Sequence, residues 1–282
     1  MRAKGVVAAV LVIVLASALA MGCSPKEPVV DPSTDPSSEN EVIKIGYIEN
    51  LTGQWSGVGL ISKIGIELAH ELRPTALGKR VELITVDSKS DKVEAANAAS
   101  RLIEKEKVVA ILAPGGSGIN LAIGEIIKTA KMPTLTKSAT SPLITQDNPW
   151  FFRCCFTNDY KALGMATYAY EQGWRKVGIV TEITNDSAVD SVATFKKAFV
   201  ELTGDPDACP VEVSYSSNDT DFNAQLGVLS RHELDGIYNP GNYSYVPIMV
   251  NQALNLGLDY KWMGSDSWEV QEFLDLGGDG VV

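Results

Sequence analysis

The amino-acid sequence predicts an α/β fold built from two lobes, each a parallel sheet flanked by helices. From residue 42 onward, short β-branched runs alternate with longer helical patterns, which is typical of βαβ units. The chain has 282 residues, more than the ~100–200 of one domain. Residues 108–140 and 234–268 also share one order of features: a strand, a Pro-Gly turn, a helix, a short strand and a polar loop. We therefore expect one lobe over residues 42–155 and a second over residues 156–282.

The segment before residue 42 is expected to lie outside this fold. A basic start precedes an apolar run over residues 6–20, which is followed by Met-Gly-Cys23. This pattern is typical of a secretory signal over residues 1–22 with lipidation of Cys23, and a plain signal peptide or a membrane anchor is the alternative. Residues 23–41 hold four prolines among serines and acids, so we expect a disordered linker there.

The expected strands and helices alternate along the rest of the chain. We expect strands at residues 43–48, 81–86, 108–112, 133–135, 151–154, 177–181, 211–215, 236–238 and 261–263. We expect helices at residues 60–72, 92–106, 120–131, 160–172, 188–202, 222–231, 245–256 and 268–276. Asp91 precedes one helix, and Thr220 with Asp221 precedes another, where short oxygen-bearing side chains satisfy free backbone N–H groups. Ligands of open parallel sheets bind at the carboxyl ends of the strands, so we expect the loops there to line a cleft between the lobes.

The turn "APGGSGIN" at residues 113–120 is a candidate anion-binding loop between a strand and a helix. It lacks the lysine of the phosphate loop, and Leu121 stands where the dinucleotide motif needs a glycine. Ile119 replaces the last glycine of the hydrolase motif G-x-S-x-G, and neither of the two histidines is expected to act as a base for Ser117. The helix N-terminus and the Ser117 hydroxyl suit a carboxylate. The sequence therefore predicts a binding protein without catalytic residues.

Asp266 lies in the matching polar loop of the second lobe. Its carboxylate would pair with a cation, so the cleft would offer hydrogen-bond donors on one side and an anion on the other. An α-amino acid carries both complementary groups. The alternative is that Asp266 caps the helix that follows it.

Charge and cysteine content narrow the functional class. Without the expected signal, the chain has 22 basic and 35 acidic residues, a formal charge of −13. This acidity argues against nucleic-acid binding and suits a soluble exported protein. Cys154, Cys155 and Cys209 show no C-x-x-C metal spacing, so we expect small buried residues, with a bridge from Cys209 to either of the others left open. We expect no metal and no cofactor.

From residue 43 to its end, the chain resembles the branched-chain amino acid (Leu/Ile/Val) type of substrate-binding protein of ABC transporters. The likeness rests on ordered segments that include "IKIGYIENLTGQWSGVG", "RLIEKEKVVAILAPGGSG", "SATSPLIT", "NPGNYSYVPIMVNQALNLGL" and "GSDSWEVQEFL". It implies the type I periplasmic-binding-protein fold, in which two Rossmann-like lobes joined by crossing strands close like a hinge. Members of this family continue further, so the resemblance also implies that the second lobe is incomplete.

The resemblance implies a set of ligand-binding residues. They are Ser117, Ser138, Ala139, Thr140, Asp266, Tyr243, Tyr160, Trp55 and Ser187. The serine after the glycine turn and the Ser-Ala-Thr loop would hold the carboxylate and amino group of the ligand, Asp266 would meet the ammonium, and the aromatic residues would complete the pocket. Ser187, Asn242 and Val58 stand where relatives often carry rings. Their loss would make the pocket wider or more polar, or would be drift without a change of ligand.

These features together predict an extracytoplasmic solute-binding protein of an ABC transporter. It would be a monomer anchored by a lipid to the cell membrane, in the periplasm or on the outer face. It would capture an amino acid in the cleft and deliver it to the permease and ATPase subunits. One alternative is a ligand-sensing domain of the same fold that feeds a signalling partner, and another is a binder of amides or other small carboxylates.

Overall fold

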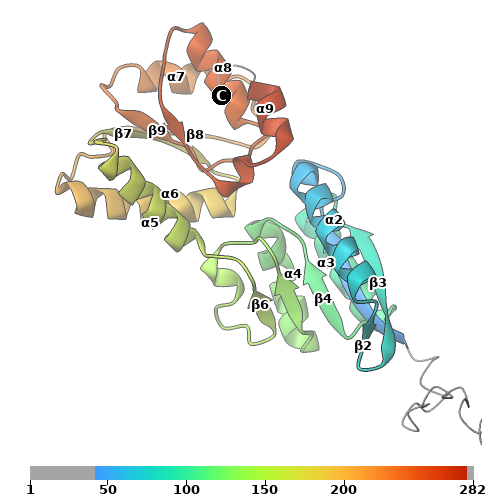
Figure 1. The fold of residues 1–282 in the computed structure, drawn as a ribbon. Helices are drawn as coiled ribbons and strands as arrows, with labels where there is room; N and C mark the ends of the chain where they lie inside the picture. The colour runs from blue at the N-terminus through green and yellow to red at the C-terminus, as the bar shows by residue number, and fades with distance from the viewer. Residues whose placement is uncertain (1–41, 278–282) are drawn as a thin grey trace, which may run out of the picture. The chain divides into compact units, whose positions relative to one another are not determined.

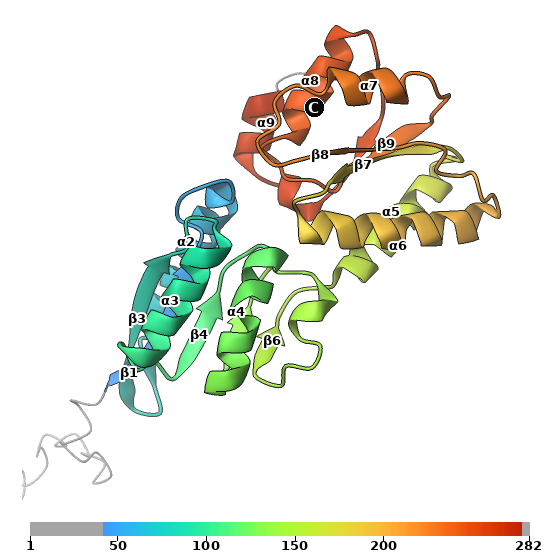
Figure 2. The ribbon, with the colours of Figure 1, turned by 180° about the vertical axis from the view of Figure 1, so that it is seen from behind.

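The computed structural model describes residues 42–277 of the chain. The expected signal segment, Cys23 and the linker lie outside these residues, as do the last five. The described part confirms the α/β prediction, because it forms two separate sheets with helices on both faces of each (Figures 1 and 2). We call the six-stranded sheet with its helices the first lobe, and the four-stranded sheet with its helices the second lobe.

The first lobe has the strand order β2-β3-β1-β4-β5-β6. Its strands are β1 (Val42–Glu49), β2 (Thr75–Ala76), β3 (Lys79–Asp87), β4 (Ala110–Ala113), β5 (Thr134–Thr136) and β6 (Phe151–Arg153). Its helices are α2 (Ser56–Leu72), α3 (Lys92–Glu104), α4 (Ser117–Ala130) and the 3-10 turn η2 (Pro142–Ile144). All neighbouring strands are parallel except β2 and β3. The carboxyl ends of β1, β4 and β5 therefore open at one edge, as expected.

The second lobe has the strand order β10-β9-β7-β8, with all pairs parallel. Its strands are β7 (Val177–Glu182), β8 (Glu212–Tyr215), β9 (Gly236–Tyr238) and β10 (Trp262–Met263). Its helices are α5 (Asn158–Glu171), α6 (Asp186–Thr203), α7 (Asn223–Leu229), α8 (Val246–Asn255), α9 (Gln271–Gly277) and the 3-10 turn η3 (Asp266–Trp268).

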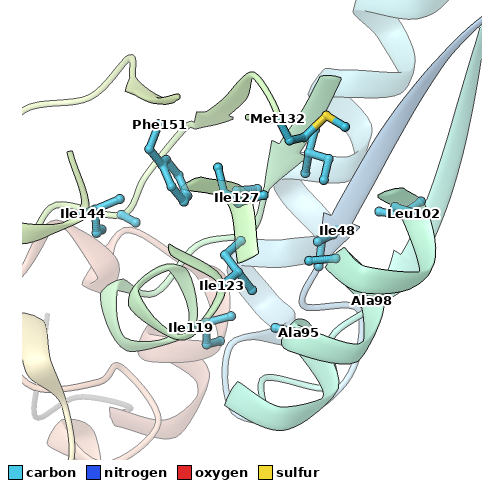
Figure 3. Close-up of a cluster of buried hydrophobic side chains, with 14 of the residues drawn as sticks. Ile48, Ala95, Ala98, Leu102, Ile119, Ile123, Ile127, Met132, Ile144 and Phe151 are labelled. Carbon is cyan, nitrogen blue, oxygen red and sulfur yellow. The ribbon is translucent and has the colours of Figure 1, made fainter. Parts of the chain in front are cut away.

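Buried apolar side chains fill the space between the first sheet and the helices α3 and α4, and between the second sheet and its helices. In the first lobe, Ile119, Ile123 and Ile127 of α4 recur at helical spacing and pack with Leu102 of α3 and Ile48 of β1 (Figure 3). In the second lobe, successive residues of β7 serve opposite faces, as a pleated strand requires. Ile179 belongs to the cluster with α5 and α6, and Val180 to the cluster with α7. Burial on both faces explains the apolar, β-branched residues Val177, Ile179 and Val180 of β7.

The observed elements differ from the expected ones mainly at their ends. The hairpin of β2 was not predicted, because its strand is two residues long and its turn depends on left-handed Leu77 and Gly78. Helix α4 begins at Ser117, three residues earlier than expected, so the serine is part of the helix. Asp91 caps α3 as predicted, accepting from the N–H groups of Val93 and Glu94. Asp221 accepts the Asn223 N–H at 3.0 Å, although Phe222 is the N-cap of α7.

The cysteines correct one expectation. Cys154 is exposed, Cys155 and Cys209 are only partly buried, and all three are free thiols. Burial nevertheless raises the pKa of the Cys209 thiol to about 11, so this thiol is a poor nucleophile at neutral pH. Within residues 42–277, no helix has the length and apolarity that crossing a membrane requires.

Candidate functional site

Both lobes line a polar cavity of about 50 Å³ at the carboxyl ends of the central strands. The first lobe contributes Trp55, Gly116, Ser117, Ser138 and Thr140. The second lobe contributes Lys161, Asn185, Ser187, Ser265, Asp266 and Ser267, together with Pro240. Six of the nine residues predicted for ligand binding therefore meet around one space: Trp55, Ser117, Ser138, Thr140, Ser187 and Asp266.

Two further cavities adjoin the polar cavity, because all three share Trp55 and Gly116. The larger one, about 210 Å³, is lined by the apolar residues Val58, Ile61 and Val270 in addition to polar groups, and we call it the apolar cavity. The smaller one, about 60 Å³, extends towards Lys92 and Asp186. The cleft thus has a polar part and an apolar part that both border Trp55, which suits a small molecule with both characters.

The glycine turn supplies hydrogen-bond donors to the cleft. Gly116 has a φ of 89°, a conformation that favours glycine, and it places the start of α4 at the cavity with no side chain capping the helix. Asn120 holds the turn by donating from Nδ2 to the carbonyls of Pro114 at 2.9 Å and Gly116 at 2.8 Å. Free N–H groups at a helix start, together with the helix dipole, favour an anion such as a carboxylate.

Two serine hydroxyls beside the turn have protons to donate. Ser117 Oγ accepts the Ser141 N–H at 3.1 Å, which leaves the hydroxyl proton of Ser117 available to a ligand. Ser138 Oγ is buried and has no hydrogen-bond partner within the described part of the chain, yet Ser138 lines both the polar and the apolar cavity. A buried hydroxyl without a partner is costly, so a ligand oxygen would satisfy it.

Thr140 and Ser187 present the opposite polarity across the two lobes. Both hydroxyls donate to Oδ1 of the buried Asn158, at 2.6 Å from Thr140 and 2.8 Å from Ser187. The two hydroxyl oxygens lie 3.1 Å apart. Because their protons are engaged by Asn158, these oxygens are left to accept hydrogen bonds from a ligand.

Lys161 is the site residue that sequence reasoning missed. Its Nζ lies 2.9 Å from Asp266 Oδ1, and its side chain is only 8% exposed. Lys161 follows Tyr160 on α5, and consecutive residues of a helix point about 100° apart, so the orientation of α5 decides which of the two reaches the cavity. No motif in the sequence signals that orientation.

Three of the predicted residues do not line the polar cavity. Tyr160 is 73% exposed on the outer side of α5. Tyr243 is fully buried, where its hydroxyl accepts the Gly57 N–H at 3.1 Å and its ring meets Trp55 edge-on. Burial raises the pKa of the Tyr243 hydroxyl, which therefore stays protonated. Ala139 is also fully buried, and its carbonyl accepts from Arg153 Nη1 at 2.9 Å.

The three positions where relatives often carry an aromatic ring differ in whether they line a cavity. Ser187 lines the polar cavity, and Val58 lines the apolar cavity, so their small size opens the cleft. Asn242 is fully buried away from both cavities. Among residues 42–277, no group of three His, Cys, Asp or Glu side chains could hold a metal ion.

A largely buried ion pair lies at the carboxyl ends of the strands of the first lobe. Lys137 Nζ pairs with Glu49 and donates to the Ala113 carbonyl at 3.2 Å, and the Tyr47 hydroxyl donates to Glu49 at 2.6 Å. Burial lowers the pKa of Lys137, and the attraction of Glu49 opposes that shift. These bonds join the carboxyl ends of β1 and β4, and so fix the point from which the glycine turn departs.

Comparison with known proteins agrees with this architecture. The family model described as "Periplasmic binding protein" matches residues 42–281. A leucine-binding protein, LivK from Thermotoga maritima, superposes with a TM-score of 0.81 at 37% identity, over 85% of this chain and 67% of that one. The branched-chain amino acid transporter substrate-binding protein LivJ from Streptococcus pneumoniae, solved with isoleucine, gives 0.78 at 26% identity, over 84% of this chain and 68% of that one.

More distant relatives share the fold or part of the sequence. An ABC-transporter solute-binding protein from R. palustris, in complex with 4-hydroxybenzoate, has a TM-score of 0.75 at 23% identity, over 84% and 66% of the two chains. Glutamate receptor 2.9 of Arabidopsis thaliana is 31% identical over 142 residues, which are 50% of this chain but 15% of the receptor. The chain thus spans only a small part of such receptors. With two lobes around a cleft and a family match over nearly all of its described residues, the chain belongs to the periplasmic binding protein family, with a type I fold related to the substrate-binding proteins of ABC transporters.

Proposed function

We propose that the protein is an extracytoplasmic solute-binding protein of an ABC transporter that captures an amino acid in its cleft and delivers it to the permease and ATPase subunits. In this proposal, residues 1–22 direct export, Cys23 carries the lipid anchor, and residues 23–41 form the linker to the membrane surface. The two lobes fall within residues 42–155 and 156–282. The family match and the likeness to amino-acid-binding proteins support this assignment.

The observation that carries the amino-acid assignment is the opposite polarity of the hydroxyls in the polar cavity. Ser117 and Ser138 have protons to donate beside the start of α4, where a carboxylate is favoured. Thr140 and Ser187 are left as acceptors, and Asp266 adds a negative charge to the lining of the same cavity. An α-amino acid would present a carboxylate to the donors and an ammonium to the acceptors and Asp266. Each charge-assisted hydrogen bond contributes about 1.5–3 kcal/mol, so three strong ones would supply most or all of the ~8.2 kcal/mol of micromolar binding.

In this proposal, the two lobes close on the ligand, and the closed form tells the permease that a ligand is bound. Ser141 Oγ of the first lobe donates to Asp190 of the second at 2.7 Å, and Thr140 meets Ser187 across the same boundary. A ligand that contacts both lobes favours the arrangement in which they are together, because only that arrangement offers all its partners. A permease would recognise this closed form.

Two substitutions test the proposal by calorimetry with a panel of amino acids. We expect Thr140→Ala and Asp266→Asn each to weaken binding of the preferred amino acid by about tenfold or more. Thr194→Ala is the matched control, since Thr194 donates to the exposed Asp159 outside the cleft, and it should leave affinity unchanged. Unchanged affinity in both cleft variants, or no binding of any amino acid, would overturn the proposal.

A ligand-sensing role is the second candidate, favoured by the partial similarity to receptors. Subunit 1 of the γ-aminobutyric acid type B receptor from Mus musculus is 27% identical over 180 residues, 60% of this chain and 18% of the receptor. The same cleft would then feed a signalling partner. Permease and ATPase genes beside this gene would favour transport, and a gene for a membrane-bound signalling protein there would favour sensing.

A further inference from the structure

The polar cavity contains a fixed cation that a site for a neutral amino acid does not need. Lys161 and Asp266 are the charged residues in its lining, and they form an ion pair of 2.9 Å. The Lys161 side chain is nearly buried at 8% exposure, whereas the Asp266 side chain is 43% exposed. Lys161 Nζ also lies 3.4 Å from Ser265 Oγ. Lysine is rarely buried without a partner, so the electrostatic state of the cavity depends on what pairs with Lys161.

An amino acid with an uncharged side chain would disturb this pair. With its α-carboxylate held at the start of α4, its ammonium would approach Asp266, which already binds Lys161, and two cations would then share one carboxylate. If Asp266 turned to the ligand, Lys161 would be left nearly buried without a counter-ion, which is costly. A neutral zwitterion therefore gains less from Asp266 than the charge of Asp266 alone suggests.

A second carboxylate on the ligand removes this conflict. The α-carboxylate would lie at the start of α4 with Ser117 and Ser138, the ammonium at Asp266 with Thr140 and Ser187, and the side-chain carboxylate at Lys161. The ammonium and the side-chain carboxylate of the ligand would then pair with Asp266 and Lys161, and the α-carboxylate would accept hydrogen bonds from neutral donors. Building on the proposed function, we infer that Lys161 is a specificity-determining residue that makes the cleft select amino acids with an acidic side chain.

The apolar cavity defines the rival ligand. Val58, Ile61 and Val270 would accept an aliphatic side chain such as that of leucine, with Lys161 still bound to Asp266. The two ligand classes make opposite predictions, because only the acidic class uses Lys161.

Calorimetry with two matched pairs of ligands tests the inference on the unmodified protein. Glutamate and glutamine, like aspartate and asparagine, have nearly the same shape and differ in side-chain charge. We expect the acid to bind about tenfold tighter than its amide in at least one pair, and tighter than leucine. Binding of both amides as tightly as their matched acids, or of leucine as tightly as the better-bound acid, would overturn the inference and leave the amino-acid function intact. No binding of any amino acid would overturn the proposed function as well.

A charge-removing variant assigns the preference to Lys161. In Lys161→Gln, the preference for the acid over its amide should fall to about threefold or less. The side chain introduced at this position is neutral, so it cannot form an ion pair with the side-chain carboxylate of the ligand. Lys196→Gln is the matched control, because Lys196 pairs with Glu212 at 2.6 Å on the same lobe but does not line the polar cavity. An undiminished preference in a folded Lys161→Gln protein would overturn the role of this residue. If that variant does not fold, the comparison of acid and amide on the unmodified protein still decides the ligand class.

Discussion

The two Pro-Gly turns end equivalent strands of the two lobes, yet they present different groups to the polar cavity. After β4, Gly116 and Ser117 line the polar cavity, and no side chain caps the helix that follows. After β9, Asn239 Oδ1 accepts the Gly241 N–H at 3.0 Å, and the buried Glu182 accepts the Asn242 N–H at 2.8 Å. The N–H groups of the second turn thus form hydrogen bonds within the protein. The residue before the turn and a buried acid distant in sequence therefore decide which of its donors are occupied.

The sharpest test of this difference is to add one methyl group to each turn. In Gly241→Ala, the new Cβ would overlap the hydroxyl oxygen of the buried Tyr215 and come within 2.8 Å of Asn239 Oδ1. We expect the free energy of unfolding to fall by about 1–3 kcal/mol, the usual cost of overpacking. In Gly115→Ala, the nearest atom is Ser138 Oγ at 3.0 Å, beside open space, so stability should fall less while ligand affinity falls. Urea denaturation measures the first effect and calorimetry the second. Equal losses of stability would contradict the distinction between the turns.

The sequence predicted the fold and part of the lining of the cleft. Alternation of strand and helix patterns predicted both sheets, because burial of β7 on two faces and of one side of α4 leaves a direct trace in residue type. Ser117 was predicted from the glycine turn at the end of a strand and Thr140 from the family resemblance, and both line the cavity. The order of strands, turns and helices along the sequence therefore suffices to predict which loops lie at the carboxyl ends of the strands.

The misses share one physical cause, which is that they depend on how an element is rotated against distant ones. Tyr160 and Lys161 are neighbours on α5, and only the packing of that helix decides that the lysine faces Asp266 and the tyrosine faces solvent. Tyr243 is buried because the Gly57 N–H and the Trp55 ring, nearly two hundred residues away, cover it. Contacts of this range leave no local pattern in the sequence.

A smaller effect on stability is expected from Asp87, which holds the loop that leads to Trp55. Asp87 accepts hydrogen bonds from the N–H groups of Leu51 at 3.0 Å and Lys89 at 2.8 Å, and from the Thr52 hydroxyl at 2.7 Å. Desolvation raises the pKa of Asp87, but these hydrogen bonds outweigh it and lower the pKa below its ordinary value of 3.8. A lowered pKa means that the folded state binds the proton less tightly than the unfolded state. The stability from Asp87 is therefore complete above pH 3.8 and is lost as the pH falls through the lower, folded value.

Asp87→Asn measures this contribution directly. The amide accepts fewer hydrogen bonds and cannot ionise, so the variant should be less stable than the parent at neutral pH. The gap between the two should stay constant from neutral pH down to about pH 5 and close below pH 3.8, in thermal unfolding followed by circular dichroism. A gap that is the same at pH 3 and pH 7 would show that the side chain acts by shape and not by charge.

The smallest effect is expected where the turn after β4 meets the second lobe, at the ion pair of Lys92 and Asp186. Lys92 Nζ lies 3.0 Å from Asp186 Oδ2, with the two side chains 56% and 43% exposed, directly beside Gly118 of α4. Exposed pairs contribute about 0.2–1 kcal/mol and are screened by salt, so Lys92→Gln should weaken ligand binding by about fivefold at most. Because this pair joins the two lobes, the loss should appear as faster ligand dissociation and should shrink in high salt. Lys63→Gln breaks a similarly exposed pair, Lys63 to Glu67 at 3.0 Å, within the single helix α2, and should leave dissociation unchanged. Equal dissociation rates in both variants and the parent would mean that the pair is incidental to closure, and that the hydroxyls and charges of the polar cavity alone hold the lobes on the ligand.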